Sequence, residues 1–518
     1  MANKSVFATM VGRLLPAASD RNAHGAPAHA YAPRHALAQL ACTGTLGDTF
    51  YQSAEAELAR LLALAEAVEP RFLAQAAIHA RRAGHMKDAT AVLLAVLARR
   101  DPVLFRAAFG RVVDGGRMLR GFVQVVRSGR TGRRSLGTAP KAMVRAWLEA
   151  ASDRAILEAA VGRDPSLADV LRMVHPKPAS RERAALYGWV IGRPHDVALL
   201  PGALQDWLRF REAGAGPVPD VPFQMLTHLP LTGAQWGEVA MAGSWQMVRQ
   251  GLNTFLRHGA FEDPAVVAAV AAKLADPARI ARARAMPYQA MVAARSVAPE
   301  MPGAVRDALH AAMEVAASNV PRLGGTVAVC PDVSGSMRSP VTGYRKGATT
   351  AVRIVDVAAL VAASVLRADP TARVLPFDTA VRAARVEARD TILTNAERLA
   401  ALCGGGTTCS APLAWLNARG EAPDLVVLVS DNQSWVDARD GRGGTATMVE
   451  WERLRARNPA ARLVCIDVAP YGTTQAQGRP DVLNVGGFSD AVWDRVAAFA
   501  RGEDGPDAWT RAVEAVAI

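Results

Sequence analysis

The chain has 518 residues, 50% of them hydrophobic and 21% charged, and a formal net charge of +12 from 60 Lys and Arg against 48 Asp and Glu. This length exceeds a single hydrophobic core, so we expect two or more domains. No stretch is long and apolar enough to cross a bilayer as a helix, which excludes a helical membrane protein.

The basic excess is mostly arginine, and it indicates a polyanionic partner. RNA or DNA is the first candidate, because a guanidinium group binds phosphate through two parallel hydrogen bonds. The alternative is a generally Arg-rich composition, since Ala, Arg and Gly are abundant throughout the chain. Charge alone leaves both alternatives open.

The cysteines and the first residues indicate an intracellular, cytoplasmic protein. The five cysteines, at positions 42, 330, 403, 409 and 465, are scattered and lack C-x-x-C spacing. They therefore predict neither a disulfide framework nor a zinc finger. Arg13 interrupts the short apolar stretch at the N-terminus before it could serve as the core of a signal peptide.

Helical patterns follow one another from about residue 35 to residue 320. Apolar residues recur at helical spacing over 53–68, 69–84, 87–101 and 102–116, and Asp101-Pro102 is typical of a helix start. Consecutive antiparallel helices of irregular length predict an α-solenoid of the HEAT type. The Pro/Gly-rich segment Gly214 to Pro222 is predicted to be a long loop between helices.

The pattern changes after residue 320. Short β-branched runs at 326–334, 372–378, 424–431 and 461–468 alternate with helical stretches such as 349–369. This alternation predicts a doubly wound parallel sheet, with helices on both faces. Ligands of such sheets bind beyond the carboxyl ends of the strands.

Asp332, Ser334 and Ser336 follow the first of these strands at alternate positions, in "VAVCPDVSGSM". Period-two spacing places the three side chains on one side of an extended backbone, where they can begin to supply the oxygen ligands that Mg²⁺ prefers. The alternative is a Ser/Gly turn after a buried strand. Two later loops reach the same edge: a glycine-rich loop with Thr407, and a strand that ends at Asp431.

This ordered pattern of Asp-x-Ser-x-Ser, Gly-Gly-Thr and Ser-Asp resembles the metal-ion-dependent adhesion site of von Willebrand factor type A domains. The resemblance implies one divalent cation, expected to be Mg²⁺, whose ligands, direct or through water, are Asp332, Ser334, Ser336, Thr407 and Asp431. It also implies binding of an acidic oxygen from a partner rather than catalysis. The sequence contains no H-E-x-x-H, G-x-S-x-G or Walker A motif, so we do not expect an enzyme.

Residues 115–147 carry eight Arg and Lys residues and no acid. The loop "RSGRTGRRS" within this segment would present clustered guanidinium groups to a phosphate backbone. A solvated helix face is the alternative. Further basic residues, among them Arg163, His175 and Lys177, follow in the next fifty positions or so.

Several segments of the helical part resemble the TROVE module of the Ro autoantigen family, in its bacterial Ro-like form. They are "APRHALAQLACTG", "GTAPKAMVRAWLEA", "DVLRMVHPKP" and "PFQMLTHLPLT". The resemblance covers nearly the whole chain, since a TROVE ring followed by a type A domain is that family's architecture. It implies an N-terminal extension at 1–20, a ring-like TROVE solenoid at 21–320 and a type A domain at 321–518.

The resemblance also implies a function, that of a ribonucleoprotein scaffold for RNA quality control or stress-linked RNA processing. Such a scaffold binds small noncoding Y RNA on a basic outer surface and holds single-stranded 3′ ends of misfolded RNA in the ring. Its ribonucleoprotein contains one copy of the protein. It works with a 3′-to-5′ exoribonuclease such as polynucleotide phosphorylase. The RNA-binding residues expected from charge and resemblance are Arg127, Arg130, Arg133, Arg134, Lys141, Arg163, His175, Lys177, Arg249, Asn253 and Arg257. The alternative function is a metal-dependent protein-adhesion scaffold on which the positive charge is incidental.

Overall fold

The computed structural model describes residues 17–283, 285, 287–317, 320–341, 343–344, 352–434, 444–469, 471–487 and 490–518. Its packing divides the chain into two compact units. The sheet unit comprises Met1–Ala67, Met286–Ser296 and Met313–Ala515, and the helical unit comprises Val68–Ala285, Val297–Ala312 and Val516–Ile518. Most of the predicted N-terminal extension, residues 1–16, lies outside the described residues.

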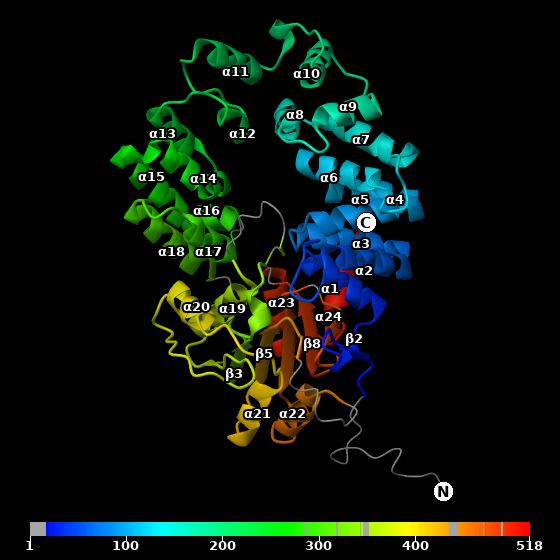
Figure 1. Ribbon diagram of the computed structural model, residues 1–518, viewed down its shortest axis with the longest axis vertical. Coiled ribbons are helices and arrows are strands. Elements are labelled where there is room, and N and C mark those ends of the chain that lie inside the picture. The colour runs from blue at the N-terminus through cyan, green and yellow to red at the C-terminus, as the bar shows by residue number, and fades with distance from the viewer. Residues whose placement is uncertain are drawn as a thin grey trace. The chain divides into compact units, whose positions relative to one another are not determined.

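The helical unit is a succession of short helices joined by tight loops (Figure 1). The α-helices are α3 (Pro70–Arg82), α4 (Asp88–Arg100), α5 (Pro102–Val112), α6 (Gly116–Arg127), α7 (Thr138–Ala150), α8 (Asp153–Ala160), α9 (Leu167–Val174), α10 (Arg181–Ile191), α11 (Gly202–Ala213), α12 (Phe223–Leu226), α13 (Gly233–Ala242), α14 (Trp245–Arg257), α15 (Pro264–Ala275) and α16 (Pro277–Arg282). Two 3-10 turns, η2 (Val197–Leu199) and η3 (Ala260–Glu262), interrupt them. The segment 214–222 forms the predicted loop between α11 and α12.

Local signals in the sequence explain where these helices begin. The side chain of Asp101 accepts hydrogen bonds from the backbone N–H groups of Val103 and Leu104, and Pro102 occupies the first turn of α5. Ser166 and Asp169 form a reciprocal capping box at the start of α9. Three phenylalanines, Phe105, Phe109 and Phe122, pack edge to face or stacked between α5 and α6 and are buried.

The sheet unit contains the predicted parallel sheet. Its five strands are β3 (Val327–Pro331), β4 (Arg373–Val374), β5 (Leu425–Ser430), β6 (Arg462–Asp467) and β8 (Val482–Gly486), in the order β4-β3-β5-β6-β8. All neighbours pair in parallel. The helices of this unit are α1 (Pro33–Thr43), α2 (Ala54–Ala67), α17 (Pro287–Ser296), α19 (Ile354–Ala368), α20 (Ile392–Ala400), α21 (Ala411–Ala418), α22 (Ala446–Arg455), α23 (Asp490–Ala500) and α24 (Ala508–Glu514); α18 (Gly303–Ala317) runs from one unit into the other, and η4 (Gly335–Arg338) is a 3-10 turn.

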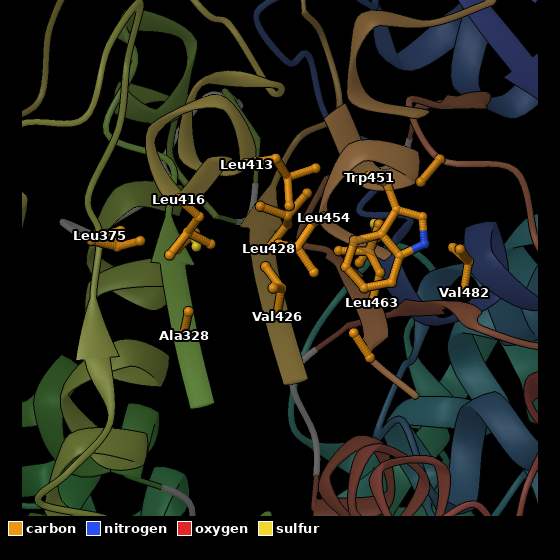
Figure 2. Packing of buried hydrophobic residues seen from close by; sticks show 14 of the residues in the cluster. Ala328, Leu375, Leu413, Leu416, Val426, Leu428, Trp451, Leu454, Leu463 and Val482 are labelled. Atoms are coloured by element: carbon orange, nitrogen blue, oxygen red, sulfur yellow. The ribbon is translucent and has the colours of Figure 1, made fainter. Parts of the chain in front are cut away.

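Alternate strand residues face opposite layers of helices. Figure 2 shows one face, on which Val426 and Leu428 of β5 and Leu463 of β6 pack beneath Leu416 of α21 and Trp451 of α22. The opposite face of β3 and β5 is covered by α19, whose residues from position 354 to 366 are buried. Because both faces are covered, the strands are continuous apolar runs rather than alternating ones.

Residues before Ala67 belong to the sheet unit, although the sequence assigned 21–320 to one helical domain. The strand β2 (Pro27–Ala30) pairs with β1 (Asp20–Arg21) and with β7 (Thr473–Thr474) in a small antiparallel sheet. The helix α1 packs against β8 and α24. The strands β1, β2, β7 and β8 were not predicted, and packing therefore groups the N-terminal residues differently from the predicted domains.

The fold class is confirmed, since a helical region is followed by a doubly wound parallel sheet. Each predicted strand run contains a strand, although the run 372–378 forms only the two-residue β4. Residues 349–351 of the predicted helical stretch lie outside the described residues, and α19 begins at Ile354. Within the described ranges, no helix has the length and hydropathy needed to span a membrane.

Candidate metal site and nucleic-acid surface

The predicted metal ligands lie on three loops at the carboxyl edge of the sheet. The strands β3 and β5 are neighbours with Pro331 opposite Val429, so Asp332 and Asp431 leave the same edge. The glycine-rich loop before α21 joins them, because the Gly335 N–H donates to the Gly405 carbonyl at 3.1 Å. Gly405 has a φ of +72°, a conformation that side chains rarely adopt, and a Cβ there would meet the carboxylate of Asp378.

Asp332 is fully buried and oriented by its neighbours. Its Oδ1 accepts a hydrogen bond from the backbone N–H of Ser334 at 2.8 Å, and its Oδ2 accepts one from the hydroxyl of Ser430 at 2.6 Å. Ser430 is the last residue of β5, and sequence reasoning did not select it. Its position at the strand end next to Asp431 was the available signal.

Asp431 faces the serines that follow β3. Its Oδ1 accepts a hydrogen bond from the Gln433 N–H at 3.1 Å, and the nearby Ser336 hydroxyl acts to lower its pKa. The Oγ atoms of Ser334 and Ser336 are 3.3 Å apart. The other carboxylate oxygen of Asp431, Oδ2, is buried and has no hydrogen-bond partner among the described residues.

The electrostatics of this cluster favour a cation. Burial raises the pKa of both Asp332 and Asp431, and for Asp332 the charge of Asp431 adds to the effect. Two buried carboxylates are costly when ionised unless an opposite charge lies between them. A divalent cation would supply that charge, and the unpaired Asp431 Oδ2 is a free ligand for it.

The residues fit a hard cation better than a transition metal. Among the described residues, no group of three or more His, Cys, Asp and Glu is placed to hold a metal ion. This site instead combines two carboxylates with hydroxyl groups, which are ligands typical of Mg²⁺. Thr407 is buried beside it, and its carbonyl accepts a hydrogen bond from Ser434. The neighbouring Thr408 has a buried Oγ1 with no hydrogen-bond partner in the part of the chain that the structure describes, so the loop offers a second hydroxyl that the predicted ligand set left out.

The predicted RNA-binding residues all lie in the helical unit, and most are exposed. Arg127 ends α6, and Arg130, Arg133 and Arg134 follow in the loop before α7. Three glycines with positive φ, at positions 129, 132 and 137, shape this loop. The Gly132 N–H donates to the Gly129 carbonyl at 3.1 Å, so the arginines project from an ordered turn.

A second group lies around α9, which contacts α6, α7 and α8. Arg163 is exposed in the loop before α9, and His175 and Lys177 are exposed just after it. His175 is the C-cap of α9 in the left-handed conformation, with φ of 48°. Lys141 lies in the first turns of α7 and is half-buried.

Two arginines of the basic segment 115–147 bind backbone carbonyls within the protein, in contrast to the exposed arginines described above. Arg120 donates to the carbonyl of Val161 at 2.7 Å and to those of Arg163 and Pro165 at 3.4 Å. Arg145 donates to the carbonyl of Val174 at the end of α9. These bonds fix the loops that present Arg163 and His175, and the basic run therefore contains both supporting and exposed cations.

A cavity of about 650 Å³ lies between the end of α6 and α9. Its lining includes Arg127 and Arg172, but also the acids Asp164 and Asp169. Arg172 Nη1 lies 3.7 Å from Asp169 Oδ1. The two acids thus partly neutralise the basic surface at this cavity. The segment 115–147, which includes the arginines of the loop after α6, contains no acid.

The third group lies on α14 at helical spacing. Arg257 is exposed, and Arg249 is half-buried with its guanidinium 5.7 Å from the ring centroid of Trp245. Asn253 is exposed, but its Oδ1 accepts a hydrogen bond from the Ala298 N–H at 2.9 Å. Asn253 therefore supports the chain at Ala298.

Comparison with known proteins agrees with this arrangement. Residues 326–500 match the family model of the Ro60 vWA domain. The chain is 28% identical over 364 residues to the RNA-binding protein RO60 of Deinococcus radiodurans, and the alignment spans 65% of this chain and 66% of that protein. The crystal structure of the Deinococcus radiodurans Ro protein superimposes with a TM-score of 0.62 at 22% identity, over 91% of this chain and 100% of that one.

The family-model match covers the metal site, and the structural likeness extends over both units. Sequence similarity and fold therefore agree: the chain resembles the Ro protein of Deinococcus radiodurans over most of its length, and its residues 326–500 match the Ro60-type von Willebrand factor A domain.

Proposed function

We propose that the chain is a non-enzymatic RNA-binding scaffold. The observation that carries the proposal is the set of exposed basic side chains after α6 and around α9, in a chain whose relative is named an RNA-binding protein. Arg127, Arg130 and Arg134 are exposed on the end of α6 and in the loop that follows it. Guanidinium groups in such loops bind phosphates without reading the base sequence.

The RNA partners proposed are Y RNA for the basic surface and single-stranded 3′ ends of misfolded RNA for α14. Structured RNA would contact Arg130, Arg133 and His175 through its phosphates and sugars. Arg249 and Arg257 lie at helical spacing and would follow a single strand. A 3′-to-5′ exoribonuclease would then act on the RNA that the scaffold holds.

Salt dependence tests the basic surface. Each phosphate contact releases counterions, so the affinity falls with salt, and each lost contact reduces the slope of log K against log salt by about one. Arg130→Glu combined with Arg133→Glu should weaken binding of a structured RNA and flatten this slope. The measurement is a filter-binding titration over a series of salt concentrations.

A matched control has the same charge change elsewhere in the helical unit. Arg193 and Arg282 are exposed and lie outside the proposed surface. Arg193→Glu with Arg282→Glu should leave the slope nearly unchanged. An equal loss of RNA affinity in both double variants would mean that net charge alone drives binding. An unchanged affinity in both would mean that the proposed surface does not bind RNA.

The second part of the proposal is a Mg²⁺ site formed by Asp332, Ser334, Ser336, Thr407 and Asp431. The buried carboxylate pair and the unpaired Asp431 Oδ2 support it. Bound Mg²⁺ would supply a Lewis-acidic position that takes an acidic oxygen of a protein partner. The candidate function of metal-dependent adhesion thus belongs to the sheet unit and is compatible with RNA binding by the helical unit.

A further inference from the structure

A cavity of about 810 Å³ lies within the sheet unit. Its wall is formed by residues within 29–35 at the N-terminal side, by residues within 474–484 around β7 and β8, and by residues within 506–514 at α24. The lining contains none of the proposed metal ligands and none of the proposed RNA-binding residues. The volume is in the range of pockets that hold small organic ligands.

His29 lines this cavity and has unpaired ring nitrogens. It is only 2% exposed, yet neither Nδ1 nor Nε2 has a hydrogen-bond partner among the described residues. His29 lies on β2 opposite Thr474 of β7, and both side chains line the cavity, as expected for a cross-strand pair on one face. Burial lowers the pKa of His29, so the imidazole is neutral at physiological pH. A neutral imidazole has one donor and one acceptor, and leaving both unpaired in a buried place is costly.

His35 presents another unpaired nitrogen to the same cavity. Its Nε2 is buried and has no hydrogen-bond partner in the described part of the chain. The His35 ring is stacked on that of Tyr31, with centroids 4.7 Å apart and planes inclined by 8°. The Tyr31 hydroxyl donates to Asp467 at 2.6 Å, which fixes the orientation of the stacked pair. Burial lowers the pKa of His35 to about 4, so this imidazole is neutral as well.

The other polar groups of the lining have partners within the protein. Three arginines line the cavity, and each forms an ion pair: Arg34 with Glu514 at 2.7 Å, Arg511 with Asp504 at 2.6 Å, and Arg479 with Asp481 at 2.8 Å. The buried Thr474 hydroxyl donates to Asn484 Oδ1 at 2.9 Å. An anion would have to draw a guanidinium group away from its carboxylate, so the lining favours an uncharged ligand that forms hydrogen bonds.

We propose that this cavity binds an uncharged planar heterocycle, the base of a nucleoside, through the ring nitrogens of His29 and His35. A nucleobase carries both donors and acceptors along its edge, and each imidazole can match either kind of group through its choice of tautomer. Rings of histidine and tyrosine are also surfaces on which bases stack. The base belongs either to a free nucleoside or to an unpaired nucleotide of RNA, since both offer this chemistry. The site depends neither on the proposed basic surface nor on the proposed metal.

Calorimetric titration of the full chain with adenosine, guanosine, cytidine and uridine tests the site. We expect binding of at least one of these nucleosides. D-ribose lacks the base, and inorganic phosphate requires an unpaired cation, so neither should bind. His29→Phe keeps an aromatic ring but removes both nitrogens, and it should weaken nucleoside binding about tenfold. His35→Phe keeps the stack on Tyr31, should weaken binding similarly, and serves if the first variant does not fold.

A matched control and a competition experiment complete the test. His228 is exposed in the helical unit, and His228→Phe should leave nucleoside affinity unchanged. Displacement of the bound nucleoside by a short single-stranded RNA would support the site with RNA as the source of the base, and retention of the nucleoside at saturating RNA would support it with a free nucleoside. Absence of binding of all the nucleosides to the wild type would overturn the proposal. Equal nucleoside affinity in the wild type and both cavity variants would also overturn it, as would equally tight binding of D-ribose.

Discussion

Arg295 of α17 and Asp356 of α19 form an ion pair, with Nη1 2.6 Å from Oδ2. Asp356 is fully buried, and Arg353 binds its other oxygen at 2.8 Å. Burial by itself would raise the pKa of Asp356, but hydrogen bonds from Arg353 and Arg295 outweigh it and hold the pKa below the usual range. The pair ties residues 287–296 to the helix that covers the sheet.

Asp356→Ala should therefore destabilise the sheet unit by about 3 kcal/mol, because it leaves two guanidinium groups without their carboxylate. Chemical denaturation followed by circular dichroism measures the loss. Since the folded pKa is depressed, the contribution is present above the unfolded pKa and disappears as the pH falls through the folded value. The exposed pair of Arg501 and Glu503 is the control, and Glu503→Ala should change stability little. An equally small effect of Asp356→Ala would contradict the role given to the buried pair.

Asp467, at the end of β6, should make stability fall as the pH rises. It accepts hydrogen bonds from the Tyr31 hydroxyl at 2.6 Å and from Gln39 at 3.1 Å. Burial, with the charge of Asp431 adding to it, raises the pKa of Asp467 to about 8. The folded state thus keeps a proton on Asp467 that the unfolded chain loses at roughly pH 4. The stabilisation by the protonated carboxyl is therefore fully present below that pH and is lost as the pH rises through about 8.

Asp467→Asn removes this titration and should flatten the decline of the melting temperature over that range. Thermal melts of the two proteins at a series of pH values give the comparison, and their difference isolates Asp467 from other titrating groups. Glu57→Gln is a useful parallel, because burial also raises the pKa of Glu57, to about 7. Parallel curves for the wild type and Asp467→Asn would show that Asp467 is ionised in the folded protein.

Lys273 caps the end of α13 from within the helical unit. Its ammonium group is buried and donates to the carbonyls of Ala240 at 3.1 Å and Gly243 at 2.7 Å, and also to that of Met241. Lys273→Met keeps most of the side-chain volume but leaves these carbonyls unsatisfied, so it should cost about 2 kcal/mol of stability. Urea denaturation tests this, with Lys141→Met as the half-buried control that should change stability much less.

Asp332→Asn should have opposite effects with and without metal. In the presence of a chelator it replaces one of two buried carboxylates by a neutral amide, so the melting temperature should stay the same or rise. With Mg²⁺ added, the wild type should melt at a higher temperature and the variant should not respond. A melting shift of equal size in both proteins would place the ion elsewhere.

The sequence predicted the metal loops because strand ends are local features. Asp332 and Asp431 each follow an apolar run, and parallel neighbours place such ends at one edge. The pairing of β3 with β5 confirms this juxtaposition, although the occupancy by Mg²⁺ stays a prediction. The succession of helices was predicted equally well from apolar spacing and Pro or Asp starts.

Long-range partnerships were not predictable. Nothing in the local pattern around Tyr31 indicates Asp467, which accepts a hydrogen bond from its hydroxyl at 2.6 Å although the two are 436 residues apart. The strand β2 has four residues, one of them proline, and too few for periodicity to reveal it. Within the basic segment, charge does not distinguish Arg120, which holds backbone carbonyls, from Arg130, which is exposed. Only tertiary contacts separate these roles.

The pairing of β2 with β7 has a consequence for synthesis of the chain. His29 and Ala30 are made early, but Thr473 and Thr474, which they pair with, are made more than 400 residues later. Contacts of such high sequence separation form slowly, and the domain that contains them cannot close until its last part has left the ribosome. The N-terminal residues must therefore wait through translation of the entire helical unit, during which the apolar face of α1 depends on temporary protection.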